Sequence, residues 1–169
     1  EDGIRDLVRS RGLGDVYKRQ PFRWLAGQYL DVLLPEGKRR AFSIANAPED
    51  AELIELHVRK VPGGGFTQQL FDAYPIGALL RIEGPLGTFV AREDSERPMI
   101  FMAGGTGFAP VKAIIEHFLH LGSARSIHLY WGARQVSDVY LPDDLWLHFN
   151  PASKRARWWL LFEPKKRKR

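Results

Sequence analysis

The sequence of 169 residues contains no cysteine, and no hydrophobic run approaches the ~20 residues needed to span a bilayer. The absence of cysteine excludes disulfides, thiolate zinc sites and any cysteine-held iron–sulfur cluster within this chain. The first residues also lack the apolar core of a signal peptide. We therefore expect a cytoplasmic protein without a membrane span.

The positive charge of the chain is confined to its ends. The formal net charge is +5, but residues 153–169 alone hold eight Lys and Arg against one Glu, and residues 21–152 are net negative. A run such as Lys165 to Arg169 also occurs in nuclear-localisation and polyanion-binding segments, but no base-stacking residues are interleaved with it. We predict a basic, non-native or disordered tail over residues 151–169 and no nucleic-acid partner.

The first twenty residues show neither strand alternation nor a helical stripe. Residues 10–20 resemble translated sequencing-adaptor sequence, so residues 1–20 are predicted to be a non-native leader, with a genuine flexible leader as the alternative. From residue 21 onward, short apolar segments alternate with Gly and Pro turns. Strands are expected at 28–34, 40–44, 53–59 and 79–83, with a short helix over 67–73. This spacing favours a small antiparallel barrel over residues 21–96.

The pattern changes after residue 97. The continuous apolar run at 99–103 is typical of a parallel strand covered on both faces. A glycine-rich loop follows, then a helix expected over 109–121 with Gly122 as its C-cap, and then a strand over 126–131. This order is a βαβ unit with a right-handed crossover. It makes residues 97–150 the beginning of an α/β domain.

Three segments carry candidate binding chemistry. In the first, Arg40 suits a phosphate, Phe42 suits a planar ring, and Ser43 can hydrogen-bond a ring nitrogen, although an ordinary edge strand would also explain them. In the second, residues 63–67 read Gly-Gly-Gly-Phe-Thr ahead of a helix, which suits either an anion or a flexible turn capped by threonine.

The third segment, residues 104–110, reads Gly-Gly-Thr-Gly-Phe-Ala-Pro between a buried strand and a helix. It matches neither the G-x-G-x-x-G fingerprint nor a P-loop. Its position nevertheless favours a dinucleotide at the carboxyl edge of a parallel sheet, where glycines permit close approach of a pyrophosphate. The five histidines show no metal-ligand spacing, so no metal site is expected.

These segments, together with Gly-Pro-Leu-Gly at 84–87 and Leu-Tyr-Trp-Gly-Ala-Arg at 129–134, occur in an order that resembles the ferredoxin–NADP reductase superfamily. Within it, the chain is most similar to bacterial NAD(P)H-dependent flavin reductases of the CDP-6-deoxy-glucoseen reductase type. The resemblance covers roughly residues 21–150. It implies an antiparallel flavin-binding barrel followed by an incomplete parallel-sheet nicotinamide-binding domain.

The resemblance also implies the cofactors, the partner and the roles of particular residues. The cofactors are FAD, with FMN as an alternative, and NADH or NADPH as electron donor; an iron–sulfur protein or domain is the partner. Ser43 is the residue expected nearest the reacting flavin nitrogen. The other residues expected to bind flavin are Arg40, Phe42, His57, Val58, Arg59, Gly64, Gly65, Phe66 and Thr67, and those expected to bind the nicotinamide cofactor are Gly105, Thr106, Gly107, Gly132 and Arg134.

The chain departs from the family pattern in three respects. The leader stands where a first barrel strand is expected, these residues contain no cysteine for the iron–sulfur domain that related reductases often carry, and the similarity fades after residue 149. The apolar residues at 158–162 are therefore expected to form an exposed patch. Two alternatives to an iron–sulfur-linked reductase stay open: a free-flavin reductase, and an inactive fragment that at most binds flavin or nucleotide.

Overall fold

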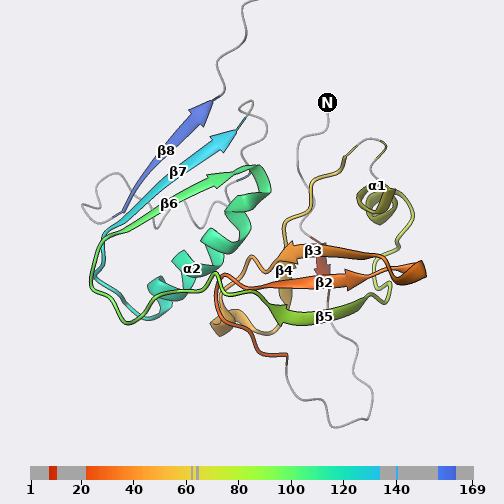
Figure 1. Ribbon diagram of the computed structural model, residues 1–169, viewed down its shortest axis with the longest axis horizontal. Helices are drawn as coiled ribbons and strands as arrows, with labels where there is room; N and C mark the ends of the chain where they lie inside the picture. The colour runs from red at the N-terminus through yellow and green to blue at the C-terminus, as the bar shows by residue number, and fades with distance from the viewer. Residues whose placement is uncertain are drawn as a thin grey trace, which may run out of the picture.

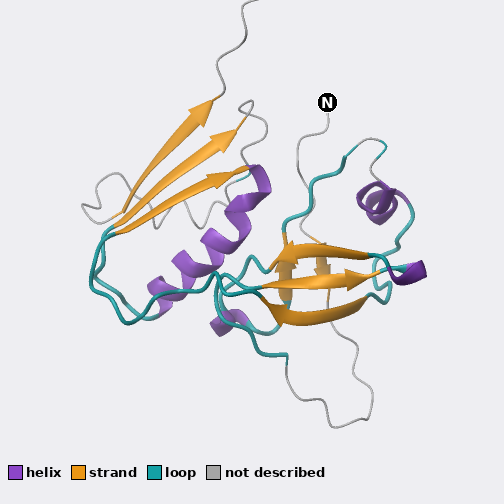
Figure 2. Ribbon diagram, viewed as in Figure 1, coloured by secondary structure: helices purple, strands orange, loops and turns teal. Residues whose placement is uncertain are grey.

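Two sheet-containing halves lie side by side, with helix α2 (Phe108–His120) between them (Figures 1 and 2). The structure, a computed structural model, describes residues 8–10, 22–61, 63, 65–133, 140 and 156–162, with the backbone alone at 8–10 and 156–162. None of the helices in these ranges is both long and apolar enough to cross a bilayer.

The first half is built on antiparallel strands. β2 (Tyr29–Leu33) lies between β3 (Arg39–Ser43) and β5 (Arg81–Leu86), and β1 (Val8–Ser10) pairs with β4 (Ile54–Leu56). Short 3-10 turns η1 (Pro35–Gly37) and η2 (Pro48–Asp50) follow β2 and β3. Helix α1 (Gly65–Asp72) lies on the side of this half away from α2 (Figure 1).

A small apolar core holds the antiparallel half together. Alternation along β2 turns Leu30 and Val32 inward, where both are almost completely buried. The side chains of Trp24, Ile44 and Phe66 complete this core. Burial of each such side chain contributes roughly 1.5–3 kcal/mol, so the sheet and α1 are tied to one apolar centre.

The strands of the first half do not close into a continuous barrel, which corrects the expected architecture. Within the described residues they form a three-stranded and a two-stranded sheet, joined by a single antiparallel bridge between Ile44 and Leu56. The expected strand over 53–59 is only three residues long. It ends where His57 leaves the sheet and turns its side chain toward α2, as described below.

The second half contains a parallel sheet. β6 (Met99–Gly104) and β7 (Ile127–Ala133) are joined through η3 (Gly105–Gly107) and α2, and β8 (Ala156–Phe162) adds a third parallel strand beside β7. The C-terminal end of α2 is closed as expected, with Gly122 at φ +62° and the amide of Leu121 donating to the carbonyl of His117.

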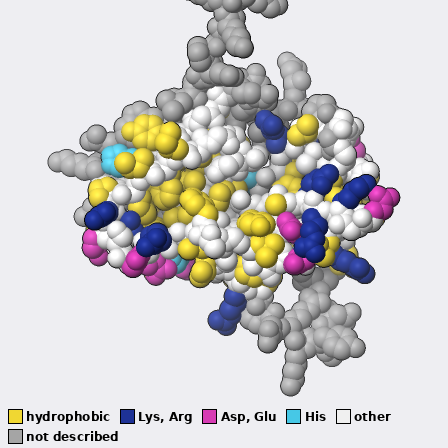
Figure 3. Space-filling model, in the orientation of Figure 1, with side chains coloured by type: hydrophobic (Ala, Val, Ile, Leu, Met, Phe, Trp, Pro, Cys, Tyr) yellow, Lys and Arg dark blue, Asp and Glu magenta, His cyan; other side chains and the backbone are white. Residues whose placement is uncertain are grey.

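Among the residues that the structure describes, only one face of β6 is covered, which also differs from the expectation. α2 packs its apolar residues against that face, around Ile114 and Ile115. On the opposite face Ile100 and Met102 are 69% and 79% exposed. In the view of Figure 3, hydrophobic side chains gather over the half of the molecule that holds β6 and α2. The continuous apolar run therefore predicted the strand correctly but not its surroundings.

Two segments within the expected leader and the expected tail form β-strands. β1 lies within the expected leader, and β8 lies within the expected disordered tail. The leader over residues 1–20 and the tail over residues 151–169 stay predictions. The run 158–162 is continuously apolar and lacks alternation, as parallel strands commonly do. The basic residues on either side of it obscured this indication of a strand. Side chains of both strands lie outside the described residues.

The two halves approach very closely at Gly27. Its φ is +103°, and a Cβ at this position would lie 2.3 Å from the Phe89 carbonyl oxygen and 2.9 Å from Ile114 Cδ1 of α2. Only glycine satisfies both the backbone conformation and the space. The contact brings the turn before β2 directly against the helix that follows the glycine-rich loop.

Candidate functional site

Two adjacent arginines on β3 have different surroundings. Arg39 is ion-paired, with Nη1 2.7 Å from Glu83 Oε2 and 3.7 Å from Asp31 Oδ2. Arg40 is exposed, and its guanidinium donates to the carbonyl of Arg39 at 2.8 Å. Within the part of the chain that the structure describes, no carboxylate pairs with Arg40. Its positive charge is thus available to an anionic group such as a phosphate.

Aromatic packing connects β3 with α1. The half-buried ring of Phe42 lies with its centroid 6.0 Å from that of Phe66, which is buried in the core. Ser43 is half-buried and pairs with Tyr29 across the sheet. The structure therefore brings Phe42 and Phe66 together.

The turn before α1 is open. A Cβ at Gly63 or Gly65 would meet no atom within 4 Å. The helix begins at Gly65, two residues before the expected start, so Thr67 lies in its first turn. Its hydroxyl accepts a hydrogen bond from the amide of Val61 at 3.4 Å. Gly64 lies outside the described residues.

The glycine-rich loop lies at the carboxyl edge of β6, as expected. Gly105 has a φ of +50°, and Cβ atoms built at Gly104, Gly105 or Gly107 would meet nothing within 4 Å. Gly132 of β7 is in register with Gly104, which places it at the same edge. The loop therefore has room on its outer side for a ligand at the start of α2. Arg134 lies outside the described residues.

Trp131 stabilises this loop through a hydrogen bond and an aromatic contact. Its side chain is 1% exposed, and its indole Nε1 donates to the Gly105 carbonyl at 3.1 Å. The indole also stacks on Phe108, the first residue of α2, with ring centroids 4.2 Å apart. In the sequence, Trp131 is recognisable only as part of the Leu-Tyr-Trp-Gly-Ala-Arg segment at 129–134. Its role in holding the loop emerges from the fold.

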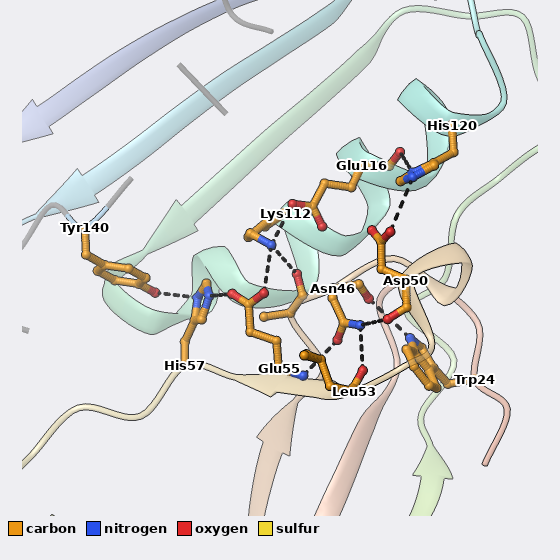
Figure 4. Close-up of polar contacts among 11 residues, drawn as sticks. Trp24, Asn46, Asp50, Leu53, Glu55, His57, Lys112, Glu116, His120 and Tyr140 are labelled. Atoms are coloured by element: carbon orange, nitrogen blue, oxygen red, sulfur yellow. Dashed lines mark hydrogen bonds and ion pairs between the residues drawn. The ribbon is translucent and has the colours of Figure 1, made fainter. Parts of the chain in front are cut away.

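A buried polar cluster joins the two halves, as Figure 4 shows. Lys112 of α2 is 5% exposed, and its Nζ lies 3.2 Å from Glu55 Oε2 and 2.6 Å from Glu116 Oε1. The other oxygen of Glu55 lies 2.8 Å from His57 Nε2, and His57 Nδ1 lies 3.1 Å from the hydroxyl of Tyr140. With its proton on Nε2, a neutral His57 donates to Glu55 and accepts from Tyr140.

The pKa values of three residues in this cluster are shifted, one downward and two upward. Burial alone would raise the pKa of Glu55, but hydrogen bonding to His57 and the charge of Lys112 outweigh it and hold that pKa below its usual range. Burial raises the pKa of Glu116, although Lys112 opposes this. Burial, with the charge of Glu55, also raises the pKa of Tyr140.

Sequence reasoning missed most of this cluster. It assigned His57, Val58 and Arg59 to the flavin, but the His57 side chain is 3% exposed and contacts Glu55 and Tyr140. Val58 is buried and Arg59 is exposed. One signal was present: Lys112 directly follows Val111 within an apolar stretch of the expected helix, where an unpaired charge would be costly.

Histidines on α2 contact acidic residues of the first half. His117 lies between Glu49 Oε1 at 2.8 Å and Glu93 Oε1 at 3.0 Å, and His120 lies 3.6 Å from Asp50. These contacts continue the interface beyond the buried cluster. Among the residues that the structure describes, no three His, Asp or Glu side chains form a set that could hold a metal ion.

An open glycine loop at the carboxyl edge of a parallel sheet is typical of dinucleotide-binding proteins, and here it stands beside an antiparallel sheet on which, among the described residues, no carboxylate pairs with Arg40. Comparison with known families agrees. The model of the oxidoreductase FAD-binding domain matches residues 15–90, and that of the oxidoreductase NAD-binding domain matches residues 101–169. The chain carries an FAD-binding and an NAD-binding oxidoreductase domain, and its fold is of the ferredoxin-reductase type.

Individual relatives are reductases. The chain is 52% identical over 118 residues to the CDP-6-deoxy-L-threo-D-glycero-4-hexulose-3-dehydrase reductase of Yersinia pestis, covering 70% of this chain and 35% of the relative. It is 44% identical to terephthalate 1,2-dioxygenase reductase component 1 of Comamonas, covering 78% and 39%. The Amycolatopsis reductase GcoB superposes with a TM-score of 0.74 at 32% identity, covering 94% and 52%. The chain thus spans about a third of the length of these curated relatives.

The residues present suit the two cofactors that the family binds. The unpaired guanidinium of Arg40 matches a phosphate, and the flat half-buried ring of Phe42 matches an aromatic ring system. The open outer side of the Gly104–Gly107 loop matches a pyrophosphate, which backbone amides at a helix start bind well.

Proposed function

We propose that the chain oxidises NADH or NADPH by transferring hydride to FAD, and that the electrons then pass to an iron–sulfur partner. The observation that carries this proposal is the open glycine loop at the carboxyl edge of β6, held against an FAD-type sheet in the same chain. The names of the relatives, which include a dioxygenase reductase component, support the same reading.

On the antiparallel half, we assign the flavin to β3 and the start of α1. Arg40 binds a phosphate of the cofactor through its unpaired guanidinium. The ring of Phe42 packs against the flavin ring system, and the hydroxyl of Ser43 hydrogen-bonds near the reacting nitrogen. The backbones of His57, Val58 and Arg59 and the turn at residues 64–67 complete this set.

On the parallel half, we assign the nicotinamide dinucleotide to the loop between β6 and α2. The amides of Gly105, Thr106 and Gly107 bind its pyrophosphate, where the positive end of the α2 dipole favours a negative charge. Gly132 and Arg134 are assigned to the adenosine side. In this scheme the domains span residues 21–96 and 97–150, and both are extended by the strands found at the ends.

A flavin held by these residues would supply the redox chemistry, namely acceptance of hydride from a nicotinamide and release of single electrons. The protein's own residues supply binding and alignment, which are effective because a well-oriented pair of reactants reacts far faster than a free one. The chain has no cysteine to hold an iron–sulfur cluster, so a separate domain or protein of that kind accepts the electrons. We assign the chain to the cytoplasm.

An anaerobic titration tests this function. The flavin-reconstituted chain is titrated with NADH and then NADPH, and the flavin absorbance bands are followed. Bleaching faster than for free flavin is the expected result. Flavin that stays bound but is not bleached would refute the proposal in favour of an inactive binding fragment. Turnover with flavin that is lost on gel filtration would favour a free-flavin reductase, and reconstitution with FMN in place of FAD separates these two cofactors.

A further inference from the structure

Lys112 is a buried cation whose hydrogen-bonding capacity is fully used. Its ammonium carries three N–H groups, and three acceptors surround it: the Ala45 carbonyl at 3.2 Å, Glu55 Oε2 at 3.2 Å and Glu116 Oε1 at 2.6 Å. Two of these acceptors belong to the antiparallel half, whereas Lys112 and Glu116 belong to α2 (Figure 4). One side chain therefore bonds both halves at once.

The acceptors on the antiparallel half form a rigid unit. The side chain of Asn46 donates to the carbonyls of Asp50 and Leu53 at 3.0 and 2.9 Å and accepts from the amide of Glu55 at 2.9 Å. The amide of Ala45 donates to the Glu55 carbonyl at 2.8 Å. Because Ala45 and Glu55 are fixed to each other, any shift of Lys112 relative to one of them disturbs both contacts.

The bonded positions lie close in sequence to the two proposed cofactor sites. Ala45 is two residues beyond Ser43, at the end of β3. Lys112 follows the last glycine of the loop, Gly107, by little more than one helical turn. The bond from the Lys112 ammonium to the Ala45 carbonyl thus connects the end of the proposed flavin strand with the helix that follows the nicotinamide loop.

We propose that Lys112 is a positioning residue that fixes the orientation of the glycine loop relative to β3 and so sets the alignment for hydride transfer. This inference rests on the proposed function. Alignment has a large effect on rate, because a displacement of about 1 Å at reacting atoms lowers a rate by about a hundredfold. A buried ion pair is, by contrast, a weak source of net stability, and a role in fixing one geometry accounts better for its place in this interface.

The experiment compares three variants with the wild-type chain. Lys112→Met removes the charge and keeps most of the volume, and Lys112→Arg keeps the charge. Lys38→Met is the matched control, because Lys38 is an exposed lysine whose one acidic partner in the described part of the chain is Glu36, two residues away. Glu55→Gln is a second route that does not depend on the folding of Lys112→Met, because it leaves Lys112 paired with Glu116.

Three quantities are measured for each variant: flavin affinity, NADH affinity and the limiting rate of flavin reduction at saturating NADH. Lys112→Met and Glu55→Gln are expected to lower the limiting rate at least tenfold while both affinities change less than threefold. Lys112→Arg is expected to recover part of the rate, and Lys38→Met to match wild type. An unchanged limiting rate in both Lys112→Met and Glu55→Gln would overturn the proposal, as would a loss confined to the affinities.

A readout without cofactors separates this inference from the proposed function. Amide hydrogen exchange of the cofactor-free chain is expected to be faster in Lys112→Met than in Lys38→Met at both residues 54–57 and α2. If the wild-type chain fails to reduce flavin, the proposed function is refuted and this exchange result decides alone. Equal exchange in Lys112→Met and Lys38→Met would then overturn the role of Lys112.

Discussion

Replacing Trp131 with phenylalanine is expected to weaken nicotinamide dinucleotide binding without affecting flavin binding. The substitution keeps an aromatic ring against Phe108 but removes the indole N–H that bonds the Gly105 carbonyl at 3.1 Å. Gly105 is held at a φ of +50° in the loop assigned to the pyrophosphate. Without this bond, the loop gains conformations in which its amides no longer converge on an anion.

The expected loss of dinucleotide affinity in Trp131→Phe corresponds to the loss of one hydrogen bond. The Gly105 carbonyl also accepts the amide of Phe108, so it is not left without a partner. The loss is therefore that of an ordinary neutral hydrogen bond, about 1 kcal/mol, rather than the cost of an unsatisfied buried group. A change of about 1 kcal/mol corresponds to about a fivefold increase in Kd.

Calorimetric titration with NAD⁺ measures this change, and Trp24→Phe is its matched control. Trp24 is also buried and donates its indole N–H to a backbone carbonyl, that of Asn46, at 3.2 Å in the other half. Both variants lose one bond and leave a similar space, so both should lose stability. A Kd for NAD⁺ that is unchanged in Trp131→Phe, or raised equally in Trp24→Phe, would refute the assignment of the loop.

Three further predictions concern the flavin site, the interface and acid stability. Arg40→Ala is expected to weaken flavin binding by between about tenfold and about a hundredfold, as measured by fluorescence quenching, because a charge-assisted bond is worth about 1.5–3 kcal/mol; Arg39→Ala should change it less, because Arg39 is already ion-paired. Gly27→Ala should destabilise the chain by several kcal/mol through the close contacts at its Cβ, whereas Gly37→Ala, at φ +72° in open space, should cost only about 1–2 kcal/mol in urea unfolding. The folded-state pKa of Glu55 is lowered, so its stabilising contribution is present above its unfolded value near 4.5 and is lost as pH falls through the folded pKa. The urea midpoint, measured between pH 3 and 7, should therefore fall less on acidification in Glu55→Gln than in wild type. An equal fall of the midpoint in both proteins would contradict this.

Local pattern predicted most of the elements because each has a local cause. The strand-like segment at 28–34 before a Pro-Glu-Gly turn predicted β2, the helical spacing at 109–121 predicted α2, and Gly122 ended that helix as expected. Barrel closure and the covering of β6 could not be predicted in the same way. Both depend on which distant segments pack together, and a continuous apolar run looks the same whether one face or two are covered.

The candidate site was predictable where backbone chemistry defines it and not where packing does. Gly104–Gly107 is visible as a glycine-rich stretch between a strand and a helix, and the structure places it at the sheet edge. The bond from Trp131 and the cluster around Lys112 join residues that are far apart in sequence. Examples are the bond between Lys112 and Glu55 and the bond between His57 and Tyr140. Sequence spacing does not predict such long-range contacts. In the sequence, the one indication of the cluster is a lysine within an apolar stretch of the expected helix.

The open face of β6 has a consequence for how the two halves respond to temperature. Ile100 and Met102 are already largely in water in the folded chain, so unfolding exposes little more of them. The heat-capacity change of unfolding grows with newly exposed apolar surface. The parallel half should therefore contribute a smaller heat-capacity change per residue than a sheet covered on both faces. Its stability should vary less steeply with temperature, with a flatter curve and a broader melting transition.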